Sequence, residues 1–138
     1  MKAFLFALLL SLSFIGCCKA LCVEQVLNTG FVNFEGTDVD TVITRLYNPN
    51  TNFSNAVDSA SLLFGAATMD TIYIPLSRKI DYTKDIEIFV PSTGNQYYIT
   101  DIQSRREKCA CGQSRRVVTS YKLDGIQHTG EDIFLVRP

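Results

Sequence analysis

Apolar and β-branched residues alternate with polar ones in short runs along most of the chain, and turn-forming residues separate these runs. Residues 41–47 are one such run, which ends at an Asn-Pro-Asn turn cluster. Residues 85–90 are another, with Ile86, Ile88 and Val90 on one face. A period of two residues is the pattern of a strand with one buried face, so both runs are predicted strands.

Further runs of this kind predict strands at 31–35, 71–76, 96–102, 116–123, 126–128 and 132–136. The segment 59–67 fits either a short strand or a helical turn. Asp124-Gly125 predicts a two-residue hairpin turn. Pro75 indicates that the strand at 71–76 is an edge strand or that the proline lies at the end of the strand. Seven to nine short strands separated by frequent turns indicate an all-β protein, an antiparallel β-sandwich of the Ig-like or a related type.

The pattern changes at the N-terminus, where 1–16 read MKAFLFALLLSLSFIG. One lysine precedes an apolar run that is shorter than the roughly 20 residues needed to span a bilayer. A cleaved secretory signal peptide therefore explains the segment better than a transmembrane anchor. The chain divides into a signal peptide at 1–16, a tether at 17–30 and a single β-sandwich domain at 31–138.

The residues that end the signal peptide, Phe14-Ile15-Gly16-Cys17, match the pattern of a bacterial lipobox. In a lipobox the cysteine sulfur carries a diacylglyceryl group, and the signal is cut directly before that cysteine. Cys17 is therefore the predicted lipidation site. The alternative is ordinary cleavage after Ala20, which would give a soluble secreted protein.

The cysteine count agrees with lipidation. The chain has five cysteines, and an odd number in an exported protein needs an explanation. Acylation of Cys17 leaves four, namely Cys18, Cys22, Cys109 and Cys111, which are disulfide candidates in an oxidising compartment. The sequence leaves their pairing open. A zinc site made of three of these cysteines and His128 is disfavoured, because the spacing is not that of a zinc motif.

Charge excludes a polycationic nucleic-acid binder, since 13 basic residues nearly balance 14 acidic ones. The basic residues nevertheless gather near the late cysteines, at Arg105, Arg106, Lys108, Arg115 and Arg116. This basic patch could face anionic lipid headgroups or an envelope polymer. The alternative is a solvated turn whose charges discourage edge-to-edge strand pairing.

Little in the sequence points to catalysis. The one histidine, His128, lies beside the predicted hairpin turn, where a solvated surface role is expected, and no nucleophile elbow or phosphate-binding loop occurs. The acidic pairs Asp38/Asp40 and Asp85/Glu87 are expected to be solvated loop and edge charges. We therefore expect no enzyme, no cofactor and no metal.

Aromatic residues offer a second class of function. Tyr73, Tyr82, Tyr97 and Tyr98 could form a platform for a glycan or another envelope polymer. Adjacent Tyr97 and Tyr98 must point to opposite faces of a strand, so only one of them can belong to the core.

The lipobox, the early cysteine, the segment DTVITRLYNPN and a late Cys-x-Cys-Gly before VVTSYKLDG resemble small lipoproteins of Bacteroidota-type bacteria that have no assigned activity. The resemblance implies location and fold, not chemistry. The function expected is that of a lipid-anchored, non-enzymatic structural or interaction module on the periplasmic side of the outer membrane. Its expected partners are the membrane and an envelope protein or polymer, and nucleic acid is not expected.

Overall fold

A computed structural model describes residues 28–63, 71–75, 81–108, 114–130 and 132–138. The chain falls into two units. Of the described residues, the smaller unit holds 105–108 and 114–117, and the larger unit holds the others.

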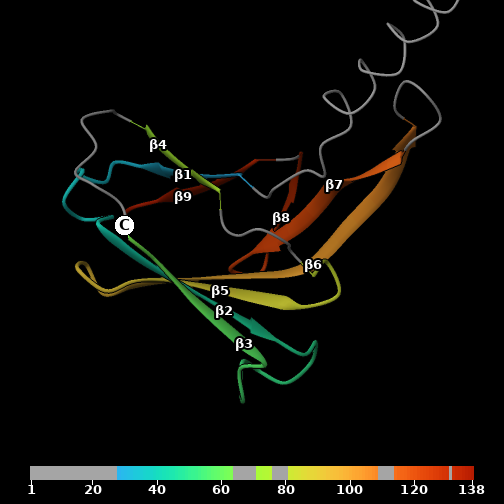
Figure 1. Ribbon diagram of the computed structural model, residues 1–138, viewed down its shortest axis with the longest axis horizontal. Coiled ribbons are helices and arrows are strands. Elements are labelled where there is room, and N and C mark those ends of the chain that lie inside the picture. The colour runs from blue at the N-terminus through green and yellow to red at the C-terminus, as the bar shows by residue number, and fades with distance from the viewer. Residues whose placement is uncertain (1–27, 64–70, 76–80, 109–113, 131) are drawn as a thin grey trace, which may run out of the picture. The chain divides into compact units, whose positions relative to one another are not determined.

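The described residues form strands and no helix (Figure 1). The strands are β1 (Asn28–Val32), β2 (Thr41–Tyr47), β3 (Asp58–Leu63), β4 (Thr71–Pro75), β5 (Asp85–Val90), β6 (Asn95–Lys108), β7 (Ser114–Leu123), β8 (Ile126–Thr129) and β9 (Ile133–Val136). The predicted all-β sandwich with seven to nine strands is thus confirmed.

Two sheets make up this architecture. The larger has the strand order β3-β2-β5-β6-β7-β8, and the smaller has the order β4-β1-β9. In the smaller sheet β1 pairs antiparallel with β4 and parallel with β9. The parallel pair departs from the predicted antiparallel arrangement, and strand alternation alone could not reveal it.

The hydrophobic core lies between the two sheets. From the small sheet it takes the fully buried Phe31, Ile133 and Leu135. From the large sheet it takes residues of β2, β5, β6 and β7, among them Val42, Ile86, Ile88, Val90, Tyr97, Ile99, Val118 and Tyr121. Both sheets therefore bury one face against the same core, which is the defining feature of a sandwich.

The predicted turns match the backbone conformation. Asp124 and Gly125 have φ values of 50° and 84°, so both lie in the left-handed region that the predicted hairpin turn requires. Between β5 and β6, the Gly94 N–H donates to the Val90 carbonyl at 2.9 Å with a φ of 71°. Pro75 ends β4, an edge strand of the small sheet, as predicted.

Several strand positions differ from the sequence interpretation. The strand predicted at 31–35 lies at Asn28–Val32 instead. The ambiguous segment 59–67 overlaps a strand, Asp58–Leu63, and its residues 64–67 lie outside the described ones. The predicted strand 96–102 continues to Lys108 as part of β6. Strand ends are set by partners in the sheet as well as by local pattern, which explains these shifts.

Candidate functional site

One face of the large sheet carries a cluster of polar and aromatic side chains away from the core. On β5, Ile86, Ile88 and Val90 point into the core, so Glu87 lies on the opposite, outer face. In the sheet register Glu87 stands between Arg45 of β2 and Tyr98 of β6. Strand pairing thus brings three outer-face side chains into one row.

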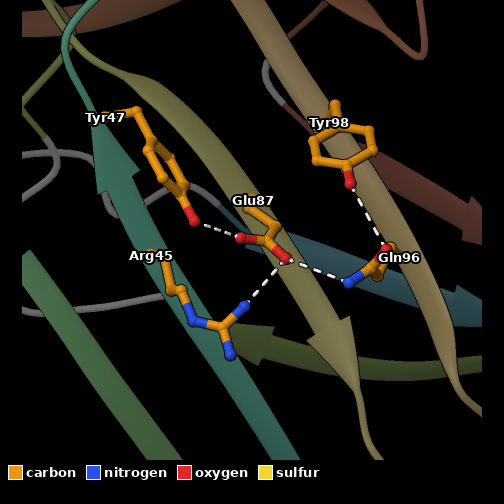
Figure 2. Close-up of polar contacts among 5 residues, drawn as sticks. All are labelled: Arg45, Tyr47, Glu87, Gln96 and Tyr98. Atoms are coloured by element: carbon orange, nitrogen blue, oxygen red, sulfur yellow. Dashed lines mark hydrogen bonds and ion pairs between the residues drawn. The ribbon is translucent and has the colours of Figure 1, made fainter. Parts of the chain in front are cut away.

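Glu87 is the centre of this cluster, and it is only 4% exposed. Its Oε1 accepts hydrogen bonds from Arg45 Nη1 at 2.8 Å and from Gln96 Nε2 at 3.3 Å. Its Oε2 accepts a hydrogen bond from the Tyr47 hydroxyl at 2.5 Å. Figure 2 shows these three side chains converging on the carboxylate, with Tyr98 donating to Gln96 beyond it. We call Arg45, Tyr47, Glu87 and Gln96 the Glu87 network.

Aromatic rings border the Glu87 network. Phe53, in the segment between β2 and β3, packs against Tyr47 with ring centroids 5.2 Å apart and against Tyr98 at 4.4 Å. Phe53 therefore contacts rings from the strands on both sides of β5. On the same face, the Arg45 guanidinium lies 5.7 Å from the ring centre of Phe89. The buried carboxylate of Glu87 thus lies on a sheet face that also carries several aromatic rings.

The electrostatics of the network favour fixed protonation states. The hydrogen bond with Glu87 raises the pKa of Arg45, so this side chain stays positively charged. Burial, followed by the hydrogen bond to Glu87, raises the pKa of Tyr47, so its phenol stays protonated and donates. The Glu87 carboxylate already accepts hydrogen bonds from the charged Arg45 and from two neutral donors, Tyr47 and Gln96. This arrangement suits a structural role better than proton transfer.

This arrangement corrects the expectation for the pair Asp85/Glu87. Glu87 is not a solvated edge charge but a buried, paired one. Asp85 is half-buried, and its desolvation raises its pKa, with a further contribution from the charge of Asp101. Asp101 in turn makes an ion pair with Lys122 at 2.7 Å.

Asp38 also has a structural partner, since its carboxylate lies 2.6 Å from Arg137 Nη1. The same Asp38 oxygen accepts the backbone N–H of Glu35 at 2.9 Å, and the Asp38 carbonyl accepts the Ser92 hydroxyl. The loop before β2 is thereby tied to the residue that follows β9. This acid is a partnered charge, not the solvated loop charge expected from the sequence.

His128 is likewise less exposed than predicted. Its ring stacks on the core residue Tyr121, with centroids 5.4 Å apart and planes 9° from parallel. Residues 121 and 128 face each other in the β7–β8 register, so strand pairing places the two rings together. The half-buried imidazole packs on the sheet.

The smaller unit contains the five residues of the basic patch, and one acidic residue, Glu107, pairs with two of them. Glu107 lies 2.6 Å from Arg105 and 3.3 Å from Arg115, and these two hydrogen bonds lower the pKa of Glu107. On a strand, positions 106 and 108 lie on the face opposite 105 and 107. Arg106 and Lys108 are therefore exposed on the opposite face from the Glu107 pairs, and Arg116 is exposed as well.

Of the four tyrosines predicted as a binding platform, the adjacent Tyr97 and Tyr98 lie on opposite faces of β6, as neighbouring positions of a strand must. Tyr97 belongs to the core, whereas Tyr98 lies on the outer face beside the Glu87 network. Tyr82 packs against the core. The side chain of Tyr73 lies outside the described part of the structure.

The predicted lipid and disulfide chemistry lies elsewhere in the chain. Cys17, Cys18, Cys22, Cys109 and Cys111 are all outside the described residues, so lipidation and disulfide pairing stay predictions. Within the described ranges, no group of three or more His, Cys, Asp or Glu side chains could hold a metal ion. The same residues include no helix long and apolar enough to cross a bilayer.

Comparisons of the chain with protein-family models, with curated proteins and with solved structures found no match.

Proposed function

We propose that this protein is a lipid-anchored, non-enzymatic interaction module of a bacterial cell envelope. The observation that carries the proposal is the apolar leader that ends directly before Cys17. Two or three acyl chains at this cysteine would hold the domain stably on a membrane, whereas one chain would not. Since Cys18 and not an aspartate follows Cys17, the periplasmic face of the outer membrane is the proposed location.

The Glu87 network supports the non-enzymatic part of the proposal. A catalytic acid or base needs a free lone pair or proton facing a substrate. Glu87 is buried and already accepts three hydrogen bonds, and the phenol of Tyr47 already donates to it. A buried carboxylate with three donors ties β2, β5 and β6 together on the outer sheet face and leaves that face as a surface for contact.

Mass spectrometry of the mature N-terminus tests the anchor. In a two-membrane bacterium producing the full chain, we expect a mature protein that begins at an acylated Cys17 and fractionates with membranes. Cys17→Ser should remove the lipid and release the protein into the soluble fraction. Cys18→Ser is the matched control and should stay acylated. A mature protein that begins at an unmodified Leu21 would contradict the proposal and support secretion.

The outer sheet face supports a second candidate, the binding of a glycan or another envelope polymer. Tyr98 and Phe53 form a half-buried aromatic pair beside the amide of Gln96 and the guanidinium of Arg45. Aromatic faces flanked by a few polar groups are the usual composition of a ligand surface.

A glycan array probed with the purified protein tests this second candidate. Binding should fall at least tenfold in Tyr98→Ala, and His128→Ala should bind as the unchanged chain does. Binding that survives Tyr98→Ala, or no binding to any glycan on the array, would remove the candidate.

A further inference from the structure

β3 is an edge strand of the large sheet, and it lacks the residues that usually keep an edge strand from pairing with another chain. Among the described residues β3 pairs with β2 on one side, and no strand pairs with it on the other. Natural proteins protect such edges with lysine, proline, bulges or covering segments, because unpaired backbone groups recruit other strands. The sequence of β3, DSASLL, contains no lysine, arginine or proline, and five of its six residues are exposed.

Hydrogen bonds indicate which backbone groups face the open side. The Ser59 N–H donates to the carboxylate of its neighbour Asp58 at 2.8 Å, so it is not committed to β2. The Ala60 carbonyl accepts the Thr44 hydroxyl of β2 at 3.3 Å, so it points toward β2. Successive residues of a strand direct these groups to opposite sides. The backbone groups of Ser59 and Ser61 therefore face the open edge.

We propose that a second copy of this chain pairs with β3 in antiparallel orientation around Ala60, joining two large sheets edge to edge. In this register the Ser59 N–H exchanges its bond to the Asp58 carboxylate for one to the Ser61 carbonyl of the other copy. The Ser61 N–H of that copy donates to the Ser59 carbonyl, and the two-fold axis repeats both bonds. Two-fold pairing requires that one surface be complementary to itself. β3 meets this requirement, because the residues with outward backbone groups lie symmetrically about Ala60.

The side chains fit the same register. Val57 and Leu63 are 50% and 81% exposed, and each lies three residues from Ala60. Antiparallel pairing around Ala60 places residue 57 of one copy beside residue 63 of the other, which removes apolar surface from water. The small side chains of Ser59, Ala60 and Ser61 let the second backbone approach. The two Asp58 carboxylates lie at opposite ends of the pairing, so like charges do not meet.

The pairing is expected to be weak and concentration-dependent, since a single edge buries less surface than a standard interface of about 1,600 Å². The inference rests on β3 alone and holds whether or not Cys17 is acylated.

Sedimentation velocity of the mature chain over a concentration series tests the pairing. Cys17→Ser keeps lipid from contributing to association, and a non-reducing gel reveals any disulfide between copies. Ser61→Pro removes an outward N–H without removing a bond to β2, so dimerisation should weaken at least tenfold. Ser61→Ala is the matched control, because it keeps the N–H and should dimerise as before. Circular dichroism establishes that both variants keep the sheet.

A second pair of variants tests the register and does not depend on proline. V57K/L63K places like charges beside each other across the axis and should weaken dimerisation at least tenfold. V57K/L63E places opposite charges there and should restore dimerisation to within about threefold at low salt, with a loss as salt rises. A chain that is monomeric up to its highest soluble concentration overturns the proposal and leaves the edge to a different protein. Dimerisation that is equal in Ser61→Pro, Ser61→Ala and both charge variants also overturns it.

Discussion

At the scale of single residues, the burial of Glu87 on the outer sheet face governs local stability. A carboxylate removed from water is tolerated because Arg45 compensates its charge and Tyr47 and Gln96 occupy further lone-pair positions. The pair with Arg45 does not by itself guarantee a net gain, because desolvation offsets much of the attraction. Removing one partner, however, leaves the others buried without compensation.

Glu87→Gln should therefore destabilise the protein by about 2–3 kcal/mol, because the Arg45 charge loses its counter-ion. Urea unfolding followed by circular dichroism measures the change. Glu107→Gln is the matched control, since Glu107 sits in a more exposed pair that solvent screens, and it should destabilise the protein less than Glu87→Gln does. Equal costs for the two substitutions would contradict the structural role of Glu87.

Three buried tyrosines predict a loss of stability in alkali. Burial raises the pKa of Tyr47, Tyr97 and Tyr121 above the ordinary value of 10.0. Above pH about 10 the unfolded chain releases phenolic protons that the folded chain retains, so the unfolded state binds fewer protons and stability falls with rising pH. The contribution is fully present below pH about 10 and disappears as pH passes through the folded-state pKa values.

Urea unfolding at a series of alkaline pH values checks this prediction, with ultraviolet absorbance reporting tyrosinate. Tyr47→Phe should make the decline shallower, because one raised pKa is removed. A stability that is flat or rising between pH about 9 and 11 would contradict it.

The sequence revealed part of the Glu87 network. Arg45 and Tyr47 lie two residues apart in a predicted strand, which already places both on one face. Their meeting with Glu87 depends on β2 lying next to β5, and Arg45 and Glu87 are 42 residues apart in the chain. Strand order is a property of the whole sheet, so local alternation could not have supplied this contact.

At the scale of elements, β9 is held by tyrosines of the other sheet. The Tyr97 hydroxyl of β6 donates to the Val136 carbonyl at 2.9 Å, and the Tyr121 hydroxyl of β7 donates to the Asp132 carbonyl at 2.9 Å. β9 is an edge strand with β1 on one side. The two hydroxyls thus bind carbonyl groups at the end of β9 and just before its start.

Tyr97→Phe and Tyr121→Phe should each cost about 1 kcal/mol, because each removes one hydrogen bond while keeping the ring in the core. Amide hydrogen exchange should become faster in β9 than in β5. Tyr98→Phe is the control, since the hydroxyl of Tyr98 bonds to an exposed-face glutamine and not to β9. Unchanged exchange in β9 in both variants would show that the hydroxyls do not hold the strand.

The sequence located most strands but not the inward face of every one. In 85–90 all three even positions are apolar and two of the three odd positions are acidic, and β5 buries the even set as predicted. In β9 all four residues are apolar, so the pattern carries no information on which pair faces the core. Ile133 and Leu135 occupy the core, whereas Phe134 and Val136 are 44% and 53% exposed.

At the scale of the whole molecule, the core shared by the two sheets makes the larger unit cooperative. Leu135 in the small sheet is fully buried in the same cluster as the β5 and β6 residues. Leu135→Ala should cost about 2–5 kcal/mol, and both sheets should unfold in one transition. Val136→Ala, at a neighbouring position that is 53% exposed, should cost less than about 1 kcal/mol.

Thermal unfolding followed by circular dichroism and by tyrosine fluorescence checks this prediction. The two signals should give the same midpoint in the unchanged chain and in Leu135→Ala. Two separate midpoints, with the small sheet melting first, would mean that the sheets are independent.

The parallel pairing of β1 with β9 also constrains the order of events during synthesis. Thr29 lies beside Ile133, so two segments about a hundred residues apart in sequence must meet before the small sheet is complete. Contacts of such long sequence separation slow folding, because the intervening loop must be closed first. A ribosome that has made β1 must still make β9 before β1 gains its second neighbour, so the nascent polypeptide stays incompletely folded until late in translation.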